Sequence, residues 1–294
     1  MVSPAGLENF GATLPRAVMM TWLESGLLGI VQGLTEFLPV SSTAHLRIVP
    51  SLLGWPDPGA AFSAVIQLGT LAAVLVYFAA DIRRLTTAAL LSLWRQEARR
   101  SADARLAWAI AAGNVPIIAC GLAFRRLIET EARSLVVVGT MLIAVGALLA
   151  LAERVARQER GMAELRLGQV VVIGLFQALA FIPGTSRSAI TIVGGLLLGL
   201  RRDEAARFSF LLGIPAILGS GLFQAPYVLA PLAAGGPGAW LPLAVGLVAA
   251  AASGYWAIGF LLAYLRTRST LVFVAYRVAL GAAVLLLVWQ GLLR

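Results

Sequence analysis

The sequence predicts an all-α polytopic membrane protein with an inverted-topology repeat, built from two broken re-entrant helical hairpins and about six transmembrane helices. Three observations support this prediction. Of the 294 residues, 60% are hydrophobic and 13% are charged, about half the charged fraction of a typical soluble domain. Several apolar stretches reach the roughly 20 residues that cross a bilayer. Two further apolar stretches are interrupted by proline and are similar to each other.

Six uninterrupted stretches are expected to be full membrane spans, because each is long, apolar and almost free of charge. We treat residues 1–294 as a single integral membrane domain. The six spans are assigned to about 60–80, 107–124, 134–152, 206–229, 240–265 and 271–290.

The two interrupted stretches lie at about 20–56 and 168–200, and they break at 39–43 and 183–186. Each break begins with a proline, which removes a backbone donor and disfavours helix in the residue before it. Lipid cannot satisfy the freed backbone groups, so the breaks must be buried in protein or line a wet cavity. We therefore expect hairpins that enter and leave the membrane by the same face.

The interrupted stretches also define the repeat. Residues 29–34 precede Phe37-Leu38-Pro39, and residues 174–179 precede Phe181-Ile182-Pro183, with one extra residue in the first copy. Three spans separate the copies, and an odd number of crossings turns the second copy upside down. This predicts an inverted repeat, about 20–152 and 168–290, with a site near the midplane where the broken helices meet.

The formal net charge of +9 comes from 23 basic residues, all arginine, against 14 acids. The arginines gather in short loops, where they indicate cytoplasmic sides and contact with membrane lipids. No basic, aromatic-rich face of a soluble domain is present, so nucleic acid is excluded as a partner. A cleaved signal peptide is not expected, since Glu8 and a single arginine precede the first apolar run. We expect both termini outside, the loop at 125–133 also outside, and on the cytoplasmic side 81–106, 153–167, 201–207, Arg266 and Arg268.

Three ionisable residues within the apolar segments mark a candidate site, because charge at membrane depth is costly. They are Glu36, His45 and Arg187. Gln32 lies four residues before Glu36, which places both on one face of a helix. Ser42 lies three residues before His45, the only histidine, so these two share a face if a helix restarts there.

The inventory suits phosphoryl transfer. The planar fork of Arg187 fits phosphate oxygens, and neighbouring hydroxyls and free backbone N–H groups add donors. A divalent cation, Mg²⁺ or Ca²⁺, is expected on Glu36 and Gln32, bridging phosphate oxygens. Ser42 is a candidate nucleophile with His45 as its base; equally, His45 activates water or protonates the leaving phosphate. The structural alternative is that Arg187 pairs with Glu36 across the pseudo-two-fold axis.

Two motifs resemble a known family. Residues 32–45, QGLTEFLPVSSTAH, and residues 183–191, PGTSRSAIT, are similar in order and content to the signatures of the bacterial undecaprenyl-pyrophosphate phosphatases known from bacitracin resistance. The resemblance implies removal of the terminal phosphate of the C55 carrier pyrophosphate, which recycles the lipid for cell-wall synthesis. It also implies a divalent cation, a bacterial inner (plasma) membrane, and a site that faces the periplasm or exterior.

Carried over by position, the resemblance assigns roles to residues of both motifs. Three departures are present: Gln32 stands where many members have glutamate, and Ala44 and Ala189 stand where glycine is usual. None of them removes a reactive group. The resemblance implies catalytic or phosphate-binding roles for Glu36, Ser42, His45, Ser186, Arg187 and Thr191. Together with the chemistry of the residues, we expect Glu36, Ser42, His45 and Arg187 to be catalytic, Glu36 and Gln32 to hold the metal, and the phosphate to be bound by Ser41, Thr43, Gly184, Ser186, Ser188 and Thr191.

The competing function is a transporter or flippase for a phosphorylated lipid or anion, which the same fold could serve. Ser42 with His45 is what distinguishes the two, because transport needs no nucleophile and base. A membrane phosphatase of the type-2 phosphatidic-acid class is disfavoured, since its signature needs a lysine and two histidines. A homodimer is compatible with the sequence, and the oligomeric state stays open.

Overall fold

The computed structural model describes residues 20–123 and 134–293. Regular structure in these residues is helical, apart from one isolated bridge between Arg160 and Leu200. The expectations about a signal peptide and about the loop at 125–133 concern residues outside the described part of the chain.

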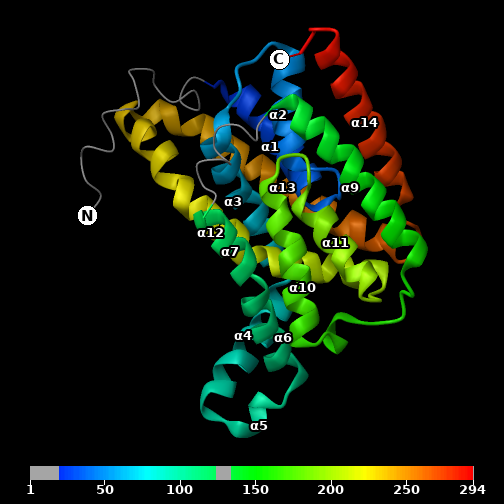
Figure 1. Cartoon of the computed structure of the whole chain (residues 1–294). Coiled ribbons are helices and arrows are strands. Elements are labelled where there is room, and N and C mark those ends of the chain that lie inside the picture. The colour runs from blue at the N-terminus through cyan, green and yellow to red at the C-terminus, as the bar shows by residue number, and fades with distance from the viewer. Residues whose placement is uncertain (1–19, 124–133, 294) are drawn as a thin grey trace.

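Within the described residues, six helices are long and apolar enough to cross a membrane, which confirms a multi-pass membrane protein. Their ends lie close to the predicted limits, except that the second begins five residues earlier and the fourth is longer at both ends. The second is interrupted at Asn114, just before Pro116, which cannot supply a backbone donor. The six spans are α3 (Gly59–Tyr77), α6 with α7 (Ala102–Gly113 and Val115–Ala123), α9 (Leu135–Val155), α12 (Arg202–Ala234), α13 (Trp240–Leu265) and α14 (Leu271–Trp289) (Figure 1).

The two interrupted segments are present where the prolines predict them. The first consists of α1 (Trp22–Phe37) and α2 (Ser42–Leu53), and the second consists of α10 (Leu167–Ala178), the single turn η5 (Leu179–Phe181) and α11 (Arg187–Leu197). In both segments the chain leaves the helix just before the proline. It starts a new helix after a short serine-rich stretch.

Each interrupted segment packs against a helix from the other half of the chain: α1 lies along α13, and α10 lies along α6 and α7. Equivalent glycines allow both contacts. A Cβ on Gly29 would overlap the carbonyl oxygen of Gly246, and a Cβ on Gly174 would overlap the carbonyl oxygen of Gly113. Only glycine permits such close backbone approach. The helices α9 and α14 also lie side by side (Figure 1).

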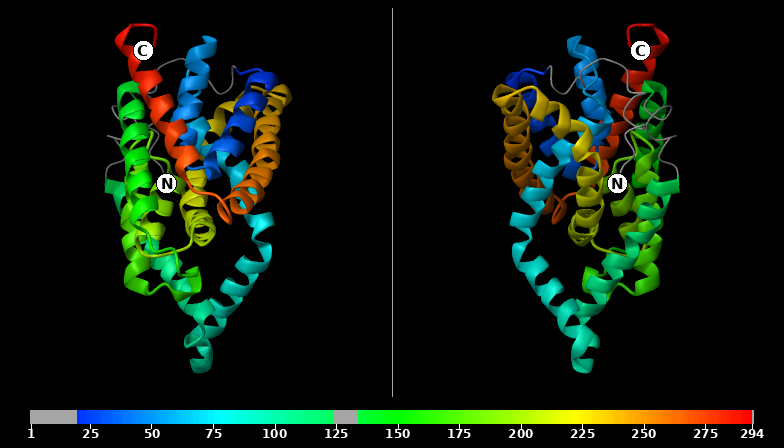
Figure 2. Two further views of the ribbon diagram at one scale, coloured as in Figure 1. Left: turned by 90° about the vertical axis from the view of Figure 1, so that its right-hand side faces the viewer. Right: turned by 90° about the vertical axis from the view of Figure 1, so that its left-hand side faces the viewer.

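The segment at 81–106, expected as a loop, is instead largely helical. The helix α4 (Ala79–Trp94) and the short α5 (Gln96–Arg99) lead into α6, and together they form a hairpin that projects beyond the bundle (Figure 2). Alanine, leucine and arginine dominate this stretch, and all three favour helix. Apolar span prediction does not detect such a helix because it carries several charges.

The arginine-rich connections meet on one side of the molecule, as expected. Arg202 forms an ion pair with Glu153, and Thr270 Oγ1 donates a 2.7 Å hydrogen bond to the same carboxylate. Arg207 forms a 2.5 Å ion pair with Asp81. These contacts join the ends of α9, α12, α14 and α4, so the basic clusters share one face of the bundle.

Candidate active site

The two breaks have the same local structure. Ser41 (φ 77°, ψ 96°) and Ser186 (φ 68°, ψ 113°) both adopt positive φ, which is unfavourable for a residue other than glycine. Each serine caps the following helix, with its Oγ accepting from the backbone N–H of Ala44 (3.4 Å) or Ala189 (3.2 Å). Two strained serines in equivalent places indicate a constrained functional geometry rather than a chance turn.

Both new helices, α2 and α11, begin at these breaks. A helix N-terminus carries a partial positive charge and several free backbone N–H groups. A second hydroxyl lies next to each capping serine, since Ser41 Oγ is 3.2 Å from Thr43 Oγ1 and Ser186 Oγ is 3.1 Å from Ser188 Oγ. The two halves therefore supply matching sets of donors for an anion.

Glu36, at the end of α1, is the shared centre of the site and is almost fully buried. Its Oε2 accepts hydrogen bonds from Ser42 Oγ at 2.6 Å and from Gln32 Nε2 at 2.8 Å. Its Oε1 accepts from Arg187 Nη2 at 3.0 Å. The predicted pairing of Arg187 with Glu36 is thus confirmed, and four of the predicted site residues meet at one carboxylate.

Arg187 has a hydrogen-bond donor that is not used by the described residues. Its Nη1 atom is buried and has no hydrogen-bond partner among the described residues. The Nη1 end of the guanidinium packs against α12, where a Cβ on Gly213 would overlap Nη1. A buried guanidinium N–H without an acceptor is costly. An incoming phosphate oxygen would remove that cost.

His45 is held at both ring nitrogens. Nδ1 lies 2.7 Å from the carbonyl oxygen of Ser41, and Nε2 lies 2.6 Å from the hydroxyl of Tyr276. A carbonyl can only accept, so Nδ1 carries the hydrogen, and in the neutral ring Nε2 accepts from Tyr276. Ser42 donates to Glu36, and no hydrogen bond joins it to His45 within the described residues. The spacing of Ser42 and His45 therefore does not produce the expected serine–histidine pair.

The remaining predicted residues lie in different settings. Ser188 Oγ donates to the carbonyl oxygen of Leu38 at 3.2 Å, which ties the second break to the first. Thr191 is fully buried and shares a 2.6 Å hydrogen bond with Ser209 Oγ, so it supports α11 against α12. Thr43 is exposed. Gly184 (φ 92°) supplies a carbonyl acceptor in the second break.

The carbonyl oxygen of Gly184 accepts a hydrogen bond from Arg277, in the middle of α14. Arg277 was not among the predicted site residues. This arginine is completely buried. The rule that identifies Glu36, a charge inside an apolar span, applies equally to Arg277 and would have found it. Its guanidinium donates to five backbone carbonyl oxygens, which are Pro39 (3.2 Å), Met141 (3.2 Å), Leu142 (3.2 Å), Gly184 (2.9 Å) and Thr185 (3.0 Å).

The chemistry of the donor set decides whether a divalent cation fits. No group of three or more histidine, cysteine, aspartate or glutamate side chains converges in the parts of the chain described here. The available ligands are the Glu36 carboxylate and Gln32 Oε1, a buried acceptor that has no partner within the described residues. Oxygen ligands suit Mg²⁺ or Ca²⁺, with phosphate oxygens completing the shell. The residues fit a cation that arrives together with a phosphate-bearing substrate.

Comparison with known proteins identifies the family of this chain. Residues 25–283 match the family described as "Bacitracin resistance protein BacA". Three relatives, all called undecaprenyl-diphosphatase, come from Myxococcus xanthus (52% identity over 272 residues, 92% of this chain and 91% of the relative), Chlorobium luteolum (47% over 279 residues, 92% and 99%) and a Nocardioides species (48% over 275 residues, 94% and 99%). The similarity spans both breaks and almost the full length of each relative.

Proposed function

The chain belongs to the bacitracin resistance protein BacA family and is an undecaprenyl-diphosphatase, and we propose that the junction of its two interrupted segments is the active site. The observation that carries the proposal is the Glu36 carboxylate, which Ser42, Gln32 and Arg187 share beside two helix N-termini. The reaction breaks the P–O–P bond of the lipid diphosphate with one water. It yields the lipid monophosphate and inorganic phosphate.

Phosphate binding is assigned to the matching ends of α2 and α11. The donors assigned to the phosphate are the backbone N–H groups there and the hydroxyls of Ser41, Thr43, Ser186 and Ser188, together with Arg187, whose Nη1 has no partner among the described residues. Positive helix ends and a guanidinium stabilise the charge that develops on the transferred phosphoryl group. Thr191 and Gly184 contribute indirectly, by holding the α11 helix and the break in place.

Glu36 is the base that this geometry offers. Its Oε2 already accepts the proton of Ser42 Oγ at 2.6 Å, so it can take that proton as an attacking oxygen bonds to the terminal phosphorus. The attacking oxygen is either Ser42 Oγ or a water that Glu36 orients. As the new P–O bond forms, the bond to the bridging oxygen breaks, and its electron pair stays with the lipid monophosphate. If Ser42 attacks, a water then releases the phosphate from the serine.

His45 acts in this scheme through its neighbours. Its bond to the Ser41 carbonyl fixes the residue with positive φ, and Tyr276 holds the other ring nitrogen. A role as acid toward the leaving phosphate would require the bond to Tyr276 to be exchanged. The structure therefore favours His45 as a residue that positions the first break.

A divalent cation, Mg²⁺ or Ca²⁺, is proposed as the cofactor. Glu36 and Gln32 Oε1 would hold it. When bound, such a cation would neutralise negative charge on the phosphates of the substrate.

We further propose that the chain is an inverted-topology repeat, about 20–152 and 168–290, with two re-entrant hairpins. The paired serine caps with positive φ support this, as does the reciprocal packing of Gly29 on Gly246 and of Gly174 on Gly113. Packing of each broken helix on the opposite half is what a pseudo-two-fold axis in the membrane plane produces.

The proposed location is the plasma membrane of a bacterium, with the arginine-rich face in the cytoplasm and the site open toward the other side. The grouping of the basic connections on one face supports this orientation. In that setting the enzyme recycles the undecaprenyl carrier for cell-wall synthesis. This activity belongs to the family described as a bacitracin resistance protein.

The test is phosphate release from undecaprenyl diphosphate by purified protein, with and without a divalent cation. Wild type should release phosphate in a cation-dependent way, and Glu36→Gln should fall by about a hundredfold or more. An absence of release from folded wild type under any cation would contradict the assignment. Movement of labelled lipid diphosphate across vesicles by the same preparation would then favour the transport alternative.

A further inference from the structure

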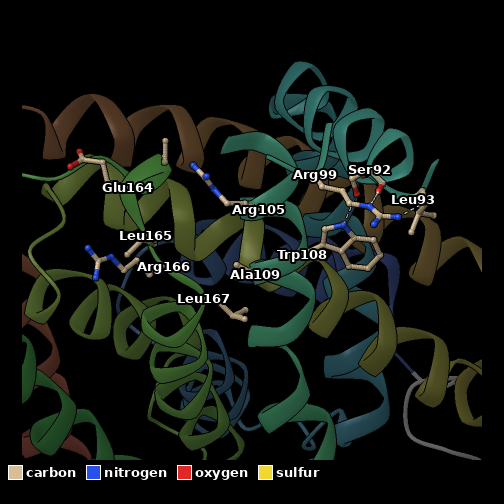
Figure 3. Close-up of a pocket in the computed structure, with 11 residues that line it drawn as sticks. Ser92, Leu93, Arg99, Arg105, Trp108, Ala109, Glu164, Leu165, Arg166 and Leu167 are labelled. Carbon is tan, nitrogen blue, oxygen red and sulfur yellow. Dashed lines mark hydrogen bonds between the residues drawn. The ribbon is translucent and has the colours of Figure 1, made fainter. Parts of the chain in front are cut away.

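A cavity of about 890 Å³ lies far from the breaks in the chain. It is bounded on one side by the α4–α5–α6 hairpin and on the other by η4 (Met162–Glu164) and the start of α10. Figure 3 shows Arg99 and Trp108 on the hairpin side, Arg166 and Leu167 on the other side, and Arg105 between them. None of the residues that line it belongs to the active site described above.

The cavity is strongly basic. Three arginines line it, Arg99, Arg105 and Arg166, against a single acid. The acid, Glu164, is already engaged, since its Oε1 accepts from the backbone N–H of Gly161 at 2.8 Å. Arg99 is fixed by donating to the carbonyl oxygens of Ser92 and Leu93 at the end of α4. The Arg105 and Arg166 guanidinium groups form no ion pair or hydrogen bond with other described residues.

Apolar groups complete the wall. Leu93, Trp108 and Leu167 line the cavity and are each about half exposed, at 47%, 48% and 57%. The indole N–H of Trp108 donates to Ser92 Oγ at 2.9 Å, which holds the ring in place with its apolar body outward. Tryptophan with one polar edge is typical of the membrane–water interface. The cavity thus joins a basic half to an apolar half.

The cavity lies at the start of two apolar helices, α6 and α10. Arg105 is the fourth residue of α6, which with α7 makes a membrane span, so it lies about 5 Å along the helix from the span's first residue. Leu167 is the first residue of α10. Both helices therefore start beside the cavity, and the residues that follow in each helix are mainly apolar.

We propose that this cavity binds the phosphate headgroup of an anionic phospholipid, with Arg105 and Arg166 supplying the positive charge that faces the phosphate and an acyl chain beside Trp108 and Leu167 (Figure 3). Paired guanidinium groups recognise phosphate oxygens, and basic pockets beside membrane spans on the arginine-rich side suit anionic headgroups. A soluble phosphate would use the basic half alone and leave the apolar half without a role. The site is independent of the phosphatase reaction.

Titration of purified protein, followed by native mass spectrometry, tests the proposal. The probes are phosphatidylglycerol and phosphatidylcholine with identical acyl chains. Wild type should retain phosphatidylglycerol selectively. The double variant R105Q/R166Q should bind it about tenfold or more weakly, since each basic residue near the surface contributes a similar part of the binding free energy for an anionic lipid. The matched control is R95Q/R100Q, which removes the same charge from exposed positions of the same hairpin outside the cavity.

The control should keep wild-type selectivity, and both double variants should release phosphate from undecaprenyl diphosphate at the wild-type rate in lipid-free detergent, which shows that they fold. Equal binding by R105Q/R166Q and wild type would overturn the proposal. So would an equal loss in the control, which would indicate general attraction to charge. Displacement of phosphatidylglycerol by millimolar inorganic phosphate would overturn the lipid and leave a soluble anion as the ligand.

Discussion

Arg187, at the start of α11, donates a 3.0 Å hydrogen bond to Glu36, at the end of α1, so each half of the chain contributes one charge to a single buried ion pair. Both side chains are largely shielded from solvent, at 11% and 5% exposure. Neither charge is stable there alone. The pair therefore holds the two breaks together, while Arg187 Nη1 stays available for an anion.

The first prediction separates the structural and catalytic roles of this pair. Removing one partner leaves the other charge buried, so Glu36→Gln or Arg187→Gln should lower the free energy of unfolding by about 3 kcal/mol. The double variant E36Q/R187Q leaves no unpaired charge and should recover most of that loss. Phosphate release should stay at least a hundredfold below wild type in all three variants. Thermal unfolding and phosphate-release assays measure the two quantities.

The informative outcome is the double variant. If it regains both stability and phosphatase activity, the pair is structural only, and the phosphoryl group is bound elsewhere. If it stays as unstable as the single variants, the ion pair is not what joins the breaks.

The second prediction concerns the space beside Arg187. In Gly213→Ala the new methyl group would occupy the position of Arg187 Nη1, so the guanidinium must move away from the site. We expect phosphate release to fall by about tenfold or more, because displacing a charged donor by about 1 Å is costly in catalysis. Gly219→Ala on the same helix is the control, since nothing lies within 4 Å of its added Cβ. Similar activity in the two variants would show that Arg187 is not constrained there.

The third prediction is that Arg277 stabilises both breaks at once. Arg277→Met keeps an unbranched apolar stem but leaves five carbonyl oxygens without the arginine donor. The free energy of unfolding should fall by about 3 kcal/mol or more, since each lost hydrogen bond leaves a buried carbonyl oxygen without a donor. Proteolysis at the breaks should increase, as should the labelling of a cysteine introduced there. Arg268→Met, an exposed arginine in the turn before α14, should change neither.

The fourth prediction tests whether His45 acts through its neighbours. Tyr276→Phe removes only the hydroxyl that lies 2.6 Å from Nε2, so the bond between Nδ1 and Ser41 survives. A positioning role predicts a modest fall in kcat, about three- to tenfold, with KM little changed. His45→Ala loses the link to Ser41 as well and should fall much further. Equally large losses in the two variants would instead place Tyr276 in contact with the substrate.

The spans, the breaks and most of the site could be predicted because each depends on local chemistry. Proline at 39 and 183 fixes where helices end, and lipid leaves little choice for the segments between. The hairpin after α3 was predicted as a loop, because its arginines lower the mean hydropathy and the segment does not resemble an apolar span.

The hydrogen bonds within the site were harder to predict because they depend on side-chain direction. Sequence spacing placed Ser42 beside His45, but the helix begins with Ser42 turned to Glu36 and His45 turned back to Ser41. The role of Arg277 depends on contacts with residues more than 90 positions away. No local pattern encodes such contacts.

The last prediction concerns the cation. Gln32 Nε2 donates to Glu36 while its Oε1 stays without a partner among the described residues, so the site offers one carboxylate and one neutral oxygen. Gln32→Glu adds a second carboxylate, which should lower the Mg²⁺ or Ca²⁺ concentration for half-maximal phosphate release by about tenfold. Gln32→Leu removes the oxygen and should raise that concentration. A chelator should abolish release in all forms, with recovery on cation addition. If neither substitution moves the midpoint, Gln32 is not a ligand, and the cation enters on the substrate's phosphates with Glu36 alone.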